Sequence, residues 1–143
     1  MISCDTNILF YYINSDCREH SAAAGYMEPL FASEEFAICE LVLIELYVLL
    51  RSPKPLPNPL SGSEALSVVQ GFRNNPHWAL IDYPGTLMDA VWKHAQRPNF
   101  SRREICDARI AETMRYHGIE EFATRNVRHF ESYGFKRLVN PID

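Results

Sequence analysis

The sequence predicts an α/β fold for residues 1–143, as one domain with a mainly parallel central sheet of about five short strands flanked by helices. Three observations predict this fold. The chain has 143 residues, a length typical of one domain that buries a core of its own. Hydrophobic residues make up 47% and charged residues 22%, which argues against disorder. Short apolar runs alternate with segments of helical length, which favours strand–helix–strand units.

The chain opens with an expected strand and helix. Residues 2–5 form a short apolar run that ends at a turn-forming Asp5, Thr6 and Asn7, so we predict a buried strand and then a helix over 6–13. The next expected elements are a helix, a strand and a helix, over residues 19–31, 36–39 and 40–51. The last of these is continuously apolar, but its length and its good helix formers favour a helix.

A proline-rich loop is expected in the middle of the chain. Its prolines alternate with other residues, which excludes a helix over 52–62: they are Pro53, Pro55, Pro57 and Pro59. Ser61 or Ser63 is expected to cap the following helix, which has Glu64 in its first turn and runs to about residue 74.

The second half continues the alternation of strands and helices. Ser101 and Glu104 have the spacing of a capping box, so we predict a helix from residue 101 to residue 117, ended by Gly118. The other expected elements are a strand over 78–82, a helix over 86–96, a strand over 122–124, a short helical turn over 126–131 and a strand over 137–139. Parallel sheets of this kind bind ligands at the carboxyl ends of their strands.

Charge is distributed unevenly along the chain. The net charge is −4, but residues 1–71 hold three Lys and Arg against nine Asp and Glu, whereas residues 72–143 hold eleven against nine. This asymmetry allows a cation site beside a phosphate-binding surface, although solvated surface charges explain it equally well. The four cysteines form no C-x-x-C motif and the first residues lack a basic region, so we expect free thiols in a cytoplasmic protein. The longest apolar run, over residues 41–50, is too short to span a membrane.

Glu45 is the most informative residue. Its neighbours on the predicted helix are all apolar: Leu41, Val42, Val48 and Leu49. An unpaired ionised carboxylate on a packing face costs several kcal/mol, so Glu45 is expected to be protonated, paired or bound to a cation. The alternative is a glutamate at the edge of the apolar stripe that reaches water.

Three further polar residues fall where a site is expected. Asp5 ends the first strand, although it also suits a helix cap. Asn126 follows a later strand and is therefore expected at the same edge of the sheet. Asp107 is expected to point inward with Ile110, Ala111 and Met114. The solvated stripe of that helix is expected to consist of Glu104, Ala108, Glu112 and Arg115.

These acids predict a metal site. Three carboxylates cannot all ionise in one pocket without a compensating charge, and oxygen ligands suit Mg²⁺ or Mn²⁺. A divalent ion held by carboxylates is typical of enzymes that act on phosphate esters. The chain has no phosphate-binding glycine loop, no dinucleotide-binding fingerprint, no nucleophile elbow and no His-Glu-x-x-His zinc motif.

Several short segments together resemble the PIN-domain family, and most closely the VapC-type ribonuclease toxins of prokaryotic toxin–antitoxin pairs. The matching segments run from end to end of the chain: residues 2–9, 43–46, 106–111, 123–126 with Phe130, and 139–141. The resemblance implies a single PIN-like domain over residues 1–143. It also implies a Mg²⁺- or Mn²⁺-dependent endoribonuclease, commonly a homodimer, neutralised by a VapB-like antitoxin.

The resemblance assigns the site residue by residue. It implies that Asp5, Glu45 and Asp107 are catalytic metal ligands, and that the hydroxyl of Thr6 supports the first of them. The family's fourth acidic position falls on Asn126, and a position that is often acidic falls on His129. Both departures reduce the negative charge available for a second metal ion. They also favour an alternative function, a catalytically weakened PIN-like module that only binds RNA or protein.

Basic and aromatic residues are candidates for contacts with partners. Phosphates of an RNA substrate need cations near the acids, and the candidates are Arg97, Arg102, Arg103, Arg109, Arg125 and Arg128. Three aromatic residues of the first helix, Phe10, Tyr11 and Tyr12, are candidates for an antitoxin groove, and at least one of them is expected in the core.

Overall fold

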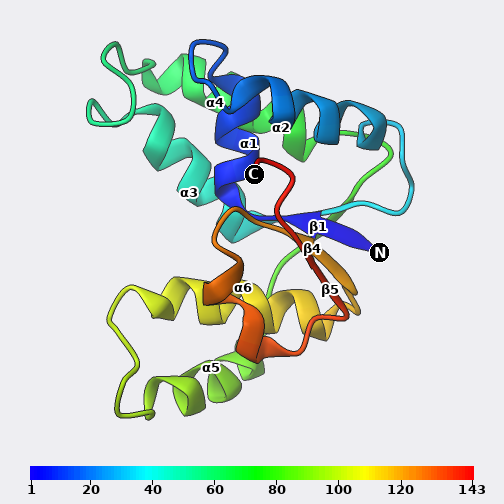
Figure 1. The fold of residues 1–143 in the computed structure, drawn as a ribbon, viewed down its shortest axis with the longest axis vertical. Coiled ribbons are helices and arrows are strands. Elements are labelled where there is room, and N and C mark those ends of the chain that lie inside the picture. The colour runs from blue at the N-terminus through cyan, green and yellow to red at the C-terminus, as the bar shows by residue number, and fades with distance from the viewer.

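The computed structural model describes all 143 residues and contains five parallel strands, each of three residues (Figure 1). Three of them pair in the order β1-β4-β5, and the other two pair with each other. The first sheet consists of β1 (Ile2–Cys4), β4 (Glu121–Ala123) and β5 (Arg137–Val139), and the second of β2 (Ala37–Cys39) and β3 (Ala79–Ile81). The predicted number and direction of the strands are thus confirmed.

The expected single sheet is divided between β1 and β2. Only an isolated parallel bridge between Ile2 and Phe36 joins the two sheets. Beyond that bridge, the hydroxyl of Ser3 donates to the carbonyl oxygen of Ala37 at 2.7 Å. A side chain therefore occupies an acceptor that a continuous ladder would give to a backbone N–H.

Six α-helices cover the strands. In Figure 1 the first four lie on one side of the strands and the last two on the other. They are α1 (Thr6–Ile13), α2 (His20–Met27), α3 (Glu40–Leu50), α4 (Gly62–Arg73), α5 (Met88–Ala95) and α6 (Glu104–Tyr116). Single 3₁₀ turns follow α2, precede α5 and connect β4 to β5: Glu28–Leu30, Gly85–Leu87, Val127–His129 and Glu131–Tyr133.

Two predicted helix caps are confirmed and one is wrong. The side chain of Asp5 caps α1, and Ser61 with Glu64 forms a complete capping box on α4. The capping box predicted for Ser101 does not form, because α6 begins at Glu104 with Arg103 at its cap position and no side-chain cap. Asp107 consequently lies in the first turn of α6, where the helix dipole favours an acid.

The solvated stripe predicted for α6 is also wrong in part. Ala108 and Glu112 are buried, because α5 packs against this side of the helix. Glu112 has two polar partners there: its Oε1 lies 2.8 Å from His94 Nε2 and 3.4 Å from the guanidinium nitrogen Nη1 of Arg115. The helical spacing of polar residues in α6 could not show that α5 would cover the side that carries Ala108 and Glu112.

One apolar core connects both sides of the strands. Its largest fully buried side chains include Phe36, Phe122 and Phe130. Phe10 is buried within it, whereas Tyr11 and Tyr12 are half-buried against it. The four cysteines form no disulfide. None of the helices combines the length and the apolar character that crossing a membrane requires.

Candidate active site

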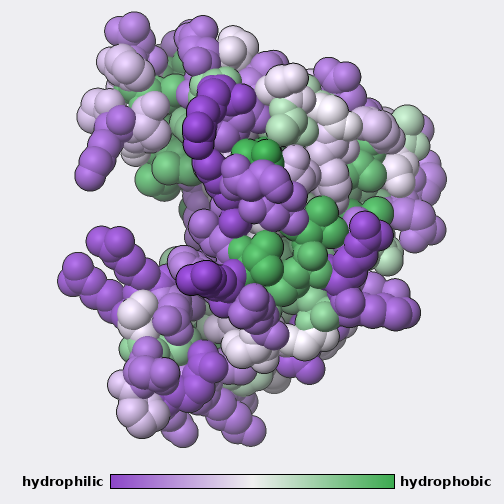
Figure 2. Space-filling view, viewed as in Figure 1, coloured by the Kyte–Doolittle hydropathy of each residue, from purple (hydrophilic) through white to green (hydrophobic).

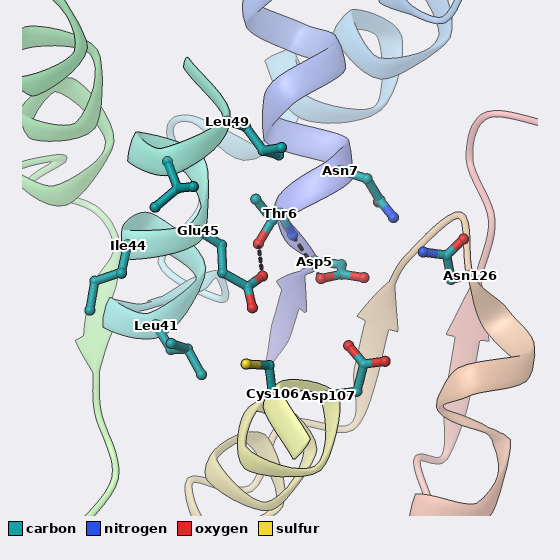
Figure 3. Close-up of a pocket in the computed structure, with 11 residues that line it drawn as sticks. Asp5, Thr6, Asn7, Leu41, Ile44, Glu45, Leu49, Cys106, Asp107 and Asn126 are labelled. Atoms are coloured by element: carbon teal, nitrogen blue, oxygen red, sulfur yellow. Dashed lines mark hydrogen bonds between the residues drawn. The ribbon is translucent and has the colours of Figure 1, made fainter. Parts of the chain in front are cut away.

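A cavity of about 480 Å³ opens where β1 ends, between α3 and the beginning of α6. Figure 2 shows the molecule hollowed between the part that carries α3 and the part that carries α5 and α6. In Figure 3 the carboxyl groups of Asp5, Glu45 and Asp107 and the amide of Asn126 face one space. The other lining residues are Thr6, Asn7, Leu41, Ile44, Val48, Leu49 and Cys106.

Asp5 is the most deeply buried of the acids, with 6% of its surface exposed. Its Oδ1 accepts a hydrogen bond from the backbone N–H of Thr6, and its Oδ2 accepts one from the hydroxyl of Thr124, both at 2.8 Å. Burial raises the pKa of the Asp5 carboxyl, and these two hydrogen bonds and the charge of His129 offset part of that rise. The two hydrogen bonds therefore fix the position of the carboxyl group, while its burial disfavours the ionised form.

Glu45 reaches the cavity from the middle of α3. The hydroxyl of Thr6 donates to its Oε2 at 2.7 Å, which links α3 to the first residue of α1. Burial raises the pKa of Glu45, and the negative charges of Asp5 and Asp107 raise it further. The other carboxyl oxygen, Oε1, makes no hydrogen bond within the protein and is available to a ligand.

Asp107 enters the cavity from the first turn of α6. Its Oδ2 lies 3.2 Å from Nδ1 of His129, which belongs to the 3₁₀ turn after β4. Burial, followed by the negative charge of Asp5, raises the pKa of Asp107 to about 6. Three carboxyl groups thus have raised pKa values in one cavity, a pattern that marks functional sites.

Asn126 lies at the edge of the cavity, after β4. Its backbone N–H donates to the hydroxyl of Thr124 at 3.0 Å, whereas its side-chain amide makes no hydrogen bond. Thr124 therefore joins Asp5 to the loop that carries Asn126. Sequence reasoning missed Thr124, although it follows β4 as Asp5 follows β1, and the rule for parallel sheets could have found it.

None of the candidate arginines lines the acidic cavity. Arg125 is engaged with the hydroxyl of Tyr11 and with the carboxylates of Glu19 and Asp143, all within 3.1 Å. Arg109 stacks on the ring of Tyr83, with its guanidinium carbon 3.7 Å from the ring centre. Three of the candidates are exposed: Arg102, Arg103 and Arg128.

Comparisons with known proteins decide the family. The model of the PIN domain family matches residues 2–136, almost the whole chain. The chain belongs to the PIN-domain family. It is 49% identical over 142 residues to Ribonuclease VapC24 of Mycobacterium tuberculosis, from the strains CDC 1551 and H37Rv, covering 99% of this chain and 97% of that one.

Solved structures share the fold of this PIN domain at lower identity. The structure of VapC20 from M. tuberculosis, described as a Sarcin-Ricin loop cleaving toxin, matches with a TM-score of 0.71 and 18% identity, covering 94% of this chain and 96% of that one. VapBC2 from Rickettsia felis, solved with a DNA fragment from its promoter, matches with a TM-score of 0.65 and 21% identity over 98% of each chain.

The donors in the cavity of this PIN domain fit a hard divalent cation. They are carboxylate and amide oxygens, and Oε1 of Glu45 and Oδ1 of Asp107 have no hydrogen-bond partner. No three His, Cys, Asp or Glu side chains are grouped closely enough to form a complete cage by themselves. Mg²⁺ does not require one, because it usually keeps several waters and binds one or two carboxylates together with substrate phosphates.

Replacing Thr124 with valine tests how this PIN domain positions Asp5. Valine has a similar shape but cannot donate to Oδ2, so we expect the pKa of Asp5 to rise further and RNA cleavage to fall about tenfold, the cost of one charge-assisted hydrogen bond. Thr124→Ser keeps the hydroxyl and is the matched control. Equal cleavage by the serine and valine variants would show that this hydrogen bond does not matter for activity.

Proposed function

We propose that this VapC-type PIN domain is a Mg²⁺- or Mn²⁺-dependent endoribonuclease and the toxin of a VapBC-type toxin–antitoxin pair. The observation that carries the proposal is that Asp5, Glu45 and Asp107, from three distant segments, line one cavity with raised pKa values. The relative at 49% identity bears the name of a ribonuclease, which supports RNA as the substrate.

The proposed roles follow from what each side chain can do. Asp5, Glu45 and Asp107 would hold the metal ion, and the amide oxygen of Asn126 would be a further ligand. A bound Mg²⁺ or Mn²⁺ would offset the carboxylate charges, polarise a phosphate oxygen and lower the pKa of the attacking water. Thr6 and Thr124 are positioning residues, because their hydroxyls orient Glu45 and Asp5.

The proposed reaction is hydrolysis of a phosphodiester bond in RNA. The oxygen of a water molecule forms a bond to phosphorus, the bond from phosphorus to the leaving oxygen breaks, and that oxygen takes up a proton. The chain contributes a cavity in which Asp5 is buried and Glu45 and Asp107 are partly buried.

Partners are part of the same proposal. Ile44 and Val48 are 56% and 57% exposed beside the cavity, and apolar side chains exposed next to a site favour a protein partner. We propose a VapB-like antitoxin as that partner, a homodimer as the assembly, residues 1–143 as one domain and the cytoplasm as the location. VapBC2 of R. felis, which shares the fold, was solved bound to a DNA fragment from its promoter.

The test is RNA cleavage by purified protein that is free of antitoxin. We expect fragments with Mg²⁺ or Mn²⁺ and none with EDTA, and cleavage should return when the metal ion is added back. The contact between His129 and Asp107 favours the alternative, a module that binds RNA without cutting it, since this contact occupies one oxygen of an acid. RNA binding without cleavage under every metal condition would support that alternative and contradict the proposal.

A further inference from the structure

A second, smaller pocket of about 210 Å³ lies beside the acidic cavity. It is formed by the segment that follows α5, the beginning of α6 and the two 3₁₀ turns between β4 and β5. Its lining is mainly polar and includes Arg97, Arg128, His129 and Ser132. Glu104 is the one acidic residue that lines it. None of the proposed metal ligands lines this pocket.

The pocket is joined to the acidic cavity by His129. This residue lines the pocket, and its Nδ1 lies 3.2 Å from Oδ2 of Asp107 in the acidic cavity. A surface depression runs between the two: Asn126 borders both the acidic cavity and the depression, and Arg128 borders both the depression and the pocket. A strand of nucleic acid that leaves the acidic cavity past Asn126 therefore meets the pocket next.

The positive charge of the pocket is available to a ligand. Arg128 is exposed and makes no hydrogen bond or ion pair within the protein. Arg97 is oriented by a hydrogen bond of 3.2 Å from its Nε to the carbonyl oxygen of His94. Its only acidic neighbour is Glu104, at 4.0 Å, which is the outer limit of an ion pair. Two arginines against one glutamate leave the pocket net positive.

Two other arginines outside this pocket already form ion pairs with carboxylates. Arg125 pairs with Glu19 and Asp143 at 3.1 Å, and Arg137 pairs with Glu121 at the same distance. A phosphate would have to displace a carboxylate to bind them. The arginines of the pocket have no such competitor at short range, so they are better placed for charge-assisted hydrogen bonds to an anion.

We propose that this pocket, with Arg97 and Arg128 as its cations, binds a backbone phosphate of single-stranded RNA adjacent to the phosphate held at the acids. The inference rests on the proposed function for the identity of the ligand. The hydroxyl of Ser132 and the amide of Asn99 add neutral donors, and neither makes a hydrogen bond within the protein. Positive charge here offsets the repulsion that the carboxylates of the acidic cavity exert on a polyanion.

The test is the salt dependence of RNA binding, with Ca²⁺ in place of Mg²⁺ so that the RNA stays intact. Each phosphate contact contributes about 0.7 to the slope of log affinity against log salt for single strands. We expect the variant Arg97→Gln/Arg128→Gln to bind more weakly and its slope to be smaller by about 0.7, the contribution of the one phosphate that the pocket holds. Lys93→Gln is the matched control, because Lys93 is exposed on α5 and lies outside the pocket.

A change of opposite sign sharpens the test. Glu104→Gln removes the negative charge from the pocket, so we expect it to strengthen RNA binding under the same conditions. Arg102→Gln/Arg103→Gln, measured in parallel, reports whether those exposed neighbours also contact RNA. Arg128→Gln alone guards against misfolding, because this side chain has no partner to lose. Its slope should fall by part of the decrease of about 0.7 that is expected for the double variant.

The outcomes separate this inference from the proposed function. If the protein cleaves RNA but Arg97→Gln/Arg128→Gln has the same salt slope as the wild type, the phosphate pocket is contradicted and the ribonuclease proposal is not. A reduced slope without any cleavage supports the pocket and overturns the ribonuclease. Titration with inorganic phosphate, followed by nuclear magnetic resonance of the arginine Nε–H groups, should shift the signal of Arg97 in the wild type. The absence of that shift contradicts a phosphate site.

Discussion

Replacing Asp5 with asparagine is expected to reduce RNA cleavage by about a thousandfold. The substitution preserves the size of the side chain but removes the charge of the most deeply buried carboxylate in the cavity. A metal ion contributes several kcal/mol to stabilising charge in a transition state, and each 1.4 kcal/mol is worth about tenfold in rate. The measurement is the initial rate of RNA cleavage with saturating Mg²⁺ or Mn²⁺.

Asp16→Asn is the matched control for this prediction. Asp16 is exposed and lies outside the acidic cavity, so the same chemical change there should leave the rate unaltered. In a bacterial host, the wild type expressed without antitoxin should arrest growth and Asp5→Asn should not. Equal toxicity of both forms would contradict catalysis and favour a protein that acts by sequestering its partner.

Asp107→Asn is expected to stabilise the metal-free protein at neutral pH by up to about 3 kcal/mol. The pKa of Asp107 rises from its ordinary value of 3.8 to about 6, mainly through burial and then through the charge of Asp5. Each pKa unit corresponds to about 1.4 kcal/mol between the two protonation states. Asparagine is neutral at every pH and still accepts a hydrogen bond from His129, so it relieves this cost.

The raised pKa of Asp107 also determines how the stability of the protein changes with pH. Between about pH 4 and pH 6 the unfolded chain has released the proton of Asp107 while the folded protein retains it, so the contribution of this group makes the wild type less stable as pH rises. Asp107→Asn does not lose stability in this way, because asparagine does not titrate. The advantage of Asp107→Asn should therefore grow from about pH 4 to about pH 6 and remain constant above that, measured by urea unfolding in EDTA.

Asp89→Asn is the control for the helix dipole. Asp89 lies exposed in the first turn of α5, as Asp107 lies in the first turn of α6. Removing an acid from that position costs about 0.3–1 kcal/mol through the dipole, with no repulsion to relieve. Destabilisation of both variants by a similar amount would show that neither burial nor the neighbouring acids disfavour the charge of Asp107.

Most of the candidate site could be predicted because its residues differ in polarity from the segments around them. Glu45 stands within an apolar helix, and Asp5 follows a buried strand. The hydrogen bond from Thr124 to Asp5 joins residues 119 positions apart, and the contact of His129 with Asp107 joins residues 22 apart. Neither residue is unusual in its own segment, so only their proximity in space reveals what they do.

The arginines illustrate the same difference. All the candidates look alike in the sequence, as cations in the basic half of the chain. The fold engages Arg125 with two carboxylates and stacks Arg109 on Tyr83, whereas it leaves Arg128 without a partner. Availability for RNA depends on which acid or ring folds against each guanidinium, and that is set by packing between distant elements.

The sequence by itself determined the succession of strands and helices, their parallel arrangement and the three acids of the cavity, because apolar periodicity, caps and turn residues act within a few positions. The tertiary structure decided the division of the strands into two sheets, the late beginning of α6 and the burial of Glu112 beside His94. Each of these depends on a contact between segments far apart in the chain. A local pattern shows that a face will be covered, but the identity of its neighbour is settled only when the whole core packs.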